Sequence, residues 1–171
     1  ELDALFVSNQ SNVSYLTGFM GLSAHEREGF FFLTQTNAFL LTFPTYFGMY
    51  KNGGDGFESL CITPDKRISD HLNELILKGH IEQIGCEPDN LTLSEHSSLS
   101  EKLKKTFVRI SSLIESVRIR KDKAEMKSIR NAARLTDLAF EFIQTKINKG
   151  ISEKELAFEL EFFFKKNGAD L

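Results

Sequence analysis

The sequence predicts an α/β fold built on a mixed sheet, followed by a purely helical segment. Short apolar runs bounded by turn residues fill the first two thirds of the chain, and helical apolar spacing separates the later runs. After residue 115 the pattern changes to a long helical period without strand signals. We therefore divide the chain into a first domain, residues 1–115, and a second segment, residues 116–171.

Six strands are expected in the first domain. Two of them flank the turn Gln35–Asn37, which favours an antiparallel hairpin, whereas the later strands alternate with helices, which favours a sandwich of helices and sheet. The sheet should therefore contain both orientations. The predicted strands are Leu2–Val7, Gly29–Leu33, Ala38–Phe43, Leu60–Thr63, Gln83–Cys86 and Phe107–Ile114.

Helices are predicted from apolar spacing in the first domain and from capping pairs in the second segment. Apolar residues from Ile68 to Ile76 share one helical face, and a weaker helix follows from Ser94. Asp122 with Glu125, and Ser152 with Glu155, have the spacing of capping boxes. These pairs predict one helix that ends at residue 150 and a second that ends at residues 167–168.

Composition excludes several classes of function. The chain has 171 residues, a net charge of −3, 41% hydrophobic residues and 26% charged residues, which is typical of a soluble globular protein. The chain lacks the overall basic charge that would favour binding to a nucleic acid or an anionic membrane. Its basic clusters, near 102–105 and 118–123, have acidic neighbours, which indicates solvated surfaces rather than phosphate-binding sites. No apolar run could span a bilayer and no leader is evident, which predicts a cytoplasmic protein.

Common catalytic motifs are missing. There is no phosphate-binding glycine loop, no G-x-S-x-G elbow and no H-E-x-x-H helix, and the NGGDG stretch fits a turn. We expect His71, His80 and His96 to face solvent rather than a metal, and Cys61 and Cys86 to be free thiols. One polar, titratable cluster remains, the segment 23–28 between two apolar runs. It fits either a solvated loop or a functional one.

Four separated motifs, in order, resemble one protein family. The opening of the creatinase N-terminal domain of Xaa-Pro dipeptidases and aminopeptidases P resembles the stretch LDALFVSNQSNVSYLTGF. A later strand and turn of that domain resembles IGCEPDNLTLSEHSSL, with Glu87 at the position of the family's glutamate. VRIRKDKAEMKSIRNAARLTDLAFEFI and GISEKELAFELEFFFKKNGAD resemble the linker and first two helices of the pita-bread catalytic domain. One departure is Thr45, which stands where the family often has an arginine near the tyrosine matched by Tyr46.

The resemblance implies a three-layer sandwich with a ribonuclease H-like motif, followed by two helices of an incomplete pita-bread domain. In such enzymes, two divalent metal ions of the Mn, Co or Zn type activate the water that cleaves the bond before proline in short peptides. The family's metal ligands fall after Leu171, so the resemblance implies neither catalytic residues nor metal ligands in this chain. Whether the chain is itself an enzyme stays open. The implied roles are homodimerisation and active-site gating, with His25, Glu26 and Arg27 as substrate-gating residues.

Two further questions stay open at this stage. The phenylalanine-rich helix near the chain's end, together with a start that lacks methionine, suggests that the chain is part of a longer protein. Its apolar face would then pack on a second copy or on the sheet, unless the phenylalanines fill an ordinary helical core. The chain could also be a stand-alone, non-catalytic binding or scaffold module, or a generic ligand-binding α/β domain.

Overall fold

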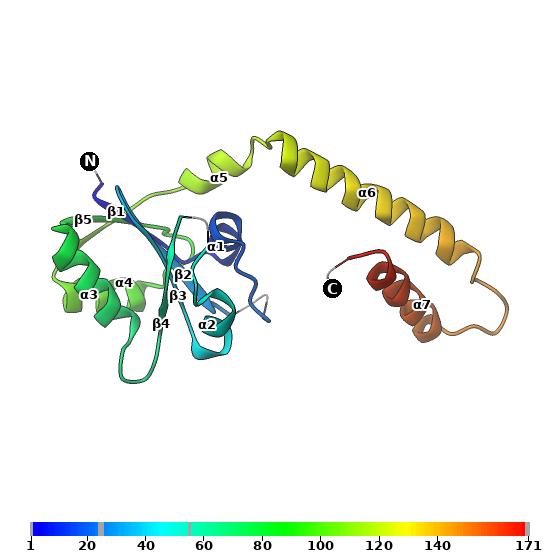
Figure 1. The fold of residues 1–171 in the computed structure, drawn as a ribbon, viewed down its shortest axis with the longest axis horizontal. Coiled ribbons are helices and arrows are strands. Elements are labelled where there is room, and N and C mark those ends of the chain that lie inside the picture. Colours follow the sequence, from blue (N-terminus) through cyan, green and yellow to red (C-terminus); the bar gives the residue numbers. More distant parts are fainter. Residues whose placement is uncertain (1, 24–25, 55, 170–171) are drawn as a thin grey trace. The chain divides into compact units, whose positions relative to one another are not determined.

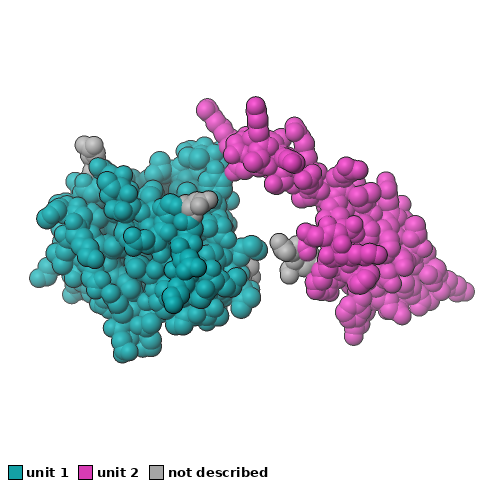
Figure 2. Space-filling view, viewed as in Figure 1, with its two compact units in different colours: residues 1–119 teal, residues 120–171 magenta. Residues whose placement is uncertain are grey.

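The computed structural model describes residues 2–23, 26–54 and 56–169, which divide into two compact units, residues 1–119 and 120–171 (Figure 2). The division falls four residues after the boundary placed at 115/116 from the sequence, because a short helix, Leu113–Arg118, packs on the first unit.

The first unit is built on a six-stranded mixed sheet of order β4-β3-β2-β1-β5-β6 (Figure 1). β1 pairs antiparallel with β2, and β2 with β3, whereas the β1–β5, β5–β6 and β3–β4 pairs are parallel. The mixed sheet predicted from the hairpin and the alternating helices is confirmed. The strands are β1 Ala4–Val7, β2 Gly29–Thr34, β3 Ala38–Thr42, β4 Glu58–Cys61, β5 Gln83–Cys86 and β6 Thr106–Arg109.

Helices cover both faces of this sheet, which gives the predicted three layers. Successive strand residues point to opposite faces, so Phe6 joins a core with α3 (Ile68–Gly79) and α4 (Leu93–Leu103). Val7 points the other way, into a core with α1 (Gln10–Thr17), α2 (Pro44–Tyr50) and α5 (Leu113–Arg118). Because both faces are buried, the central strands read as continuous apolar runs.

Three helices on the second face were not predicted from the sequence: α1 and α2, described here, and α5, described below. The Asn9 side chain caps α1 by accepting from the backbone N–H groups of Ser11 and Asn12, and Gly18 ends the helix with φ +69°. Pro44 is the first residue of α2. Both helices are under nine residues long, too short for a repeated apolar period to stand out.

Three predictions from the sequence are wrong. The helix expected to end at residue 150 ends at Gln144, and Thr145 is its C-cap. The strand expected to run to Ile114 ends at Arg109, because Ser112 adopts a left-handed backbone, φ +58°, and starts α5. His71 does not face solvent: its side chain is buried, with Nε2 2.9 Å from the carbonyl oxygen of Cys61. That carbonyl gives a buried imidazole its polar partner, so the helix turns this residue inward. Cys61 and Cys86 are free thiols, as predicted.

The second unit is a pair of helices, α6 (Lys123–Gln144) and α7 (Glu153–Lys166). Both predicted capping boxes are present, one between Asp122 and Glu125 and the other between Ser152 and Glu155. The helices pack through stacked rings of Phe142 and Phe163, whose centroids are 4.7 Å apart.

The two helices do not bury all of their own phenylalanine side chains against each other. Phe140, Phe158 and Phe162 are each more than half exposed. Within the described ranges, no helix is both long enough and apolar enough to cross a membrane.

Candidate functional site

The segment 18–28, between α1 and β2, contains the polar cluster singled out in the sequence, and its first half is packed through Phe19. The Phe19 ring is fully buried and lies 5.4 Å from the ring of Tyr46 and 5.2 Å from that of Tyr50. A Cβ atom on Gly29 would come within 2.7 Å of the Phe19 ring, so glycine is needed at this position for the close approach. The start of the loop is therefore fixed to α2 and β2.

Glu28 holds the middle of the loop through both carboxylate oxygens. Tyr46 donates its hydroxyl hydrogen to Glu28 Oε1 at 2.5 Å, and the backbone N–H of Ser23 donates to Oε2 at 3.1 Å. The Tyr46 hydroxyl oxygen also accepts from the backbone N–H of Leu22 at 3.0 Å. The Tyr46 bond lowers the pKa of Glu28, while burial and the same bond raise the pKa of Tyr46. The pair is thus a neutral phenol donating to an ionised carboxylate.

Arg27 fastens the end of the loop to the opposite side of the sheet. Its guanidinium forms an ion pair with Glu95 of α4 and donates from Nη1 to the backbone oxygen of Asn90 at 2.9 Å. The same group lies 6.0 Å from the centre of the Phe30 ring. Burial raises the pKa of Glu95, but hydrogen bonds from Arg27 and Thr92 outweigh it, and the net pKa is lowered.

The three predicted gating residues therefore have different positions. His25 lies outside the described residues. Glu26 is exposed, and its backbone N–H donates to the Ser23 hydroxyl at 3.1 Å. The side chain of Arg27 is only 26% exposed, and its guanidinium is held by Glu95 and Asn90.

The partners that fix this loop were not predicted from the sequence. Tyr46 and Tyr50 stand four residues apart after a proline, a spacing that places them on one face of a short helix and could have indicated their role. Glu95 offered no such signal, because it lies 68 residues from Arg27 and also has the spacing of an ordinary capping residue for Thr92.

A second polar cluster is closed and structural. Glu87, 8% exposed, accepts from the backbone N–H groups of Ser8 and Asn9, each at 2.7 Å, and from Asn12 Nδ2 at 2.5 Å. Asn12 Nδ2 also donates to Glu115 Oε1 at 2.6 Å, a bond that lowers the pKa of Glu115. This cluster joins β1, α1, the turn after β5 and α5, which are distant in sequence.

The described residues contain no set of side chains suited to binding a metal ion. In the ranges that the structure describes, no group of three or more histidine, cysteine, aspartate or glutamate side chains could hold a metal ion. The two divalent ions implied by the resemblance therefore do not fit the described part of this chain.

The protein is a three-layer α/β domain with a helical extension. It has a six-stranded mixed sheet between two helical layers, a polar loop held by its neighbours, and a following helical pair. The chain belongs to the creatinase/prolidase N-terminal domain family, whose model matches residues 1–120.

Relatives and solved structures agree with this family. The chain is 28% identical over 170 residues to an uncharacterized peptidase of Bacillus subtilis, covering 99% of this chain and 46% of that protein. An Xaa-Pro dipeptidase of Pyrococcus horikoshii is 26% identical, with 99% and 45% covered. The structure of an Xaa-Pro dipeptidase from Bacillus anthracis superposes with a TM-score of 0.79 at 30% identity, covering 98% of this chain and 45% of that one.

An X-Pro aminopeptidase from Thermotoga maritima shares the fold, with a TM-score of 0.81, 24% identity, and 99% and 48% covered. The chain thus spans about half the length of the curated relatives it matches.

Proposed function

We propose that this chain is the N-terminal, non-catalytic part of a cytoplasmic Xaa-Pro dipeptidase or aminopeptidase, which hydrolyses the bond before proline in short peptides. One observation carries the proposal: a likeness to the Bacillus anthracis Xaa-Pro dipeptidase that runs through both units and covers 98% of this chain at 30% identity. Catalysis, and the divalent metals that serve it, would belong to the other half of such a protein.

Within this proposal the loop 18–28 gates access to the active site. Glu28 and Arg27 are held at two points on opposite sides of β2, which would fix the end of the loop without a bound substrate. Glu26, which is exposed, and His25 are the residues we propose to meet the peptide, while Arg27 positions them. The contacts that hold Arg27 and Glu28, beside the polar residues of this loop, support this assignment.

The helical pair supports the second proposed role, which is assembly. Leaving a large aromatic side chain in water forgoes about 1.5–3 kcal/mol relative to burying it. Phe140, Phe158 and Phe162 are 63%, 59% and 66% exposed, so their surface would be covered in the complete protein. We propose that the rest of the peptidase and a second subunit cover it.

Hydrolysis by the product of the complete gene tests the proposal. We expect that protein, supplied with Mn²⁺, Co²⁺ or Zn²⁺, to cleave Ala-Pro and not Ala-Ala, and the present chain to cleave neither. Its mass should be about twice the 19.4 kDa of this chain, since the relatives are about twice as long. A native product of 19.4 kDa would instead support the stand-alone binding or scaffold module.

The gating role is tested by kinetics of the same full-length protein. The double variant His25→Ala and Glu26→Ala should change KM for dipeptides more than kcat. Lys51→Ala, an exposed substitution at the end of α2, is the matched control. Unchanged kinetics in the double variant would refute the gating role while leaving the peptidase assignment intact.

A further inference from the structure

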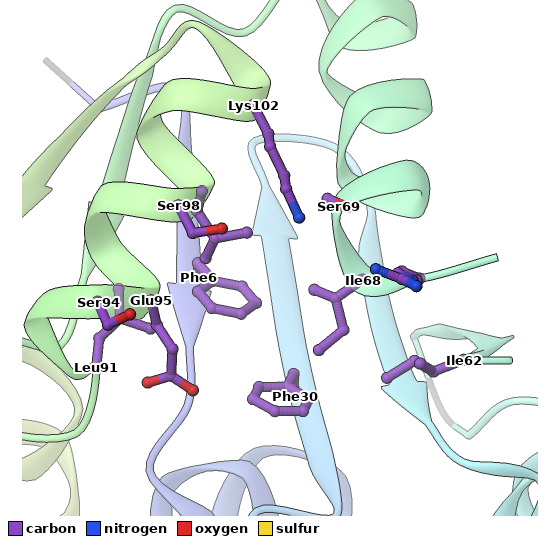
Figure 3. A pocket seen from close by; sticks show the side chains of 12 residues that line it. Phe6, Phe30, Ile62, Ile68, Ser69, Leu91, Ser94, Glu95, Ser98 and Lys102 are labelled. Atoms are coloured by element: carbon purple, nitrogen blue, oxygen red, sulfur yellow. The ribbon is translucent and has the colours of Figure 1, made fainter. Parts of the chain in front are cut away.

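A pocket of about 360 Å³ lies between α3 and α4, on the face of the sheet opposite α1 and α2 (Figure 3). Its floor is aromatic and aliphatic. The rings of Phe6 and Phe30 stack there with centroids 5.8 Å apart, and Ile62 closes one side. These floor residues are 1%, 7% and 6% exposed, so they present a firm apolar surface rather than mobile side chains.

The rim of this pocket is cationic. Arg67 precedes α3, and Lys102 extends from α4 toward Ser69 of α3 (Figure 3). Neither cation takes part in an ion pair among the described residues. Both also line an adjoining hollow with the carboxylates of Asp65 and Asp70, and Asp70 accepts from the backbone N–H of Arg67 at 2.8 Å.

The carboxylate on the pocket wall is already paired. Glu95 accepts from Arg27, as described above, and from Thr92 through its backbone N–H and its hydroxyl. Inside this pocket a bound anion would therefore meet two cations without an ion pair and one neutralised carboxylate, while Asp65 and Asp70 line the adjoining hollow. The rim favours one negative charge on the ligand.

Size and shape set the rest of the ligand. Ligand pockets enclose about 300–1,000 Å³, so this one is at the small end and suits a single ring or a short branched chain. The pocket has an apolar floor, a polar mouth and a rim with a net positive charge. These features suit an amphipathic molecule bound with its apolar end inward.

We propose that this pocket binds a small amphipathic carboxylate, with its apolar group on Phe6 and Phe30 and its carboxylate at Arg67 and Lys102. The proposal is independent of the peptidase assignment, because every residue involved lies in the first unit of this chain.

Binding of phenylpropionate to the 171-residue chain tests the proposal, with phenylpropanol as its uncharged counterpart. Backbone amide NMR should show saturable shifts at Ile68, Leu91 and Ser98, with a dissociation constant of about 1 mM or lower for the carboxylate. The alcohol should bind about two- to tenfold more weakly, since an exposed charge pair contributes modestly. Equal affinity for the two compounds, or no saturable shifts at these three residues, would overturn the proposal.

Variants separate the rim from the floor. The double variant Arg67→Gln and Lys102→Gln should weaken phenylpropionate binding about four- to tenfold and leave phenylpropanol unchanged. Lys51→Gln, which removes one positive charge on the opposite layer, is the control and should change neither. Ser98→Phe, which fills the pocket, should abolish binding of both compounds.

The rim variants retain the floor and the backbone bond that caps α3, so they keep the test decisive if Ser98→Phe fails to fold. Undiminished binding by a folded Ser98→Phe protein, or by the double rim variant, would place the ligand elsewhere and refute the assignment.

Discussion

Replacement of Glu87 by alanine should destabilise the first unit strongly. Its carboxylate accepts three hydrogen bonds, from the backbone of Ser8 and Asn9 and from the side chain of Asn12. Alanine leaves these three donors without their acceptor in a site that is nearly closed to water. Each buried donor left unsatisfied costs about 1–3 kcal/mol. Because one of the three is only partly buried, we expect a total loss of about 3–5 kcal/mol.

The residue composition of the chain provides a selective assay for this loss. The sequence has no tryptophan, and its three tyrosines, Tyr15, Tyr46 and Tyr50, all lie in the first unit. Tyrosine fluorescence during urea unfolding therefore reports this unit alone, and the midpoint at unchanged slope gives the change in the free energy of unfolding.

A matched control and a conservative variant sharpen the result. Glu101→Ala, at an exposed position of α4, should cost less than about 0.5 kcal/mol. Glu87→Gln keeps one oxygen but turns an N–H₂ group toward the Asn12 donor, so it should fall between the two. A loss below about 1 kcal/mol for Glu87→Ala would refute our account of the cluster as a closed, satisfied network.

Three further predictions concern the loop and the helical pair. Folding lowers the pKa of Glu28, so the stability that this carboxylate contributes is complete above its ordinary pKa and is lost as the pH falls through the lowered pKa. When urea midpoints are measured against pH, Glu28→Gln should therefore reduce the loss of stability at acid pH. An unchanged loss would contradict this prediction. Arg27→Ala should speed amide hydrogen exchange in residues 26–28, and Arg27→Lys should restore part of the protection. Equal exchange rates in the parent protein and both variants would show that the ion pair does not hold the loop. Phe142→Ala should remove the stacking on Phe163 and lower the stability of the second unit by about 1–2 kcal/mol. Helical circular dichroism should fall while tyrosine fluorescence stays unchanged. A coincident change in both signals would contradict the division into two units.

Local patterns that carry their own physical cause were read correctly. The capping pairs Asp122–Glu125 and Ser152–Glu155 act within four residues, so no distant partner is needed to predict them. The same holds for the hairpin at residues 35–37. Predictions failed where a tertiary contact competed with a local pattern, as at His71, which the carbonyl of Cys61 satisfies in the interior.

Residue spacing along the chain was enough to predict the six apolar runs, the mixed sheet, the helical extension and the family resemblance. Tertiary structure alone decided which polar residues meet. Arg27 and Glu95 are 68 positions apart, and Asn12 and Glu87 are 75 apart. It also created the pocket between α3 and α4, whose cations come from segments that no local period connects. Such sites depend on how the sheet brings distant segments together, and the pattern within any one segment does not record that arrangement.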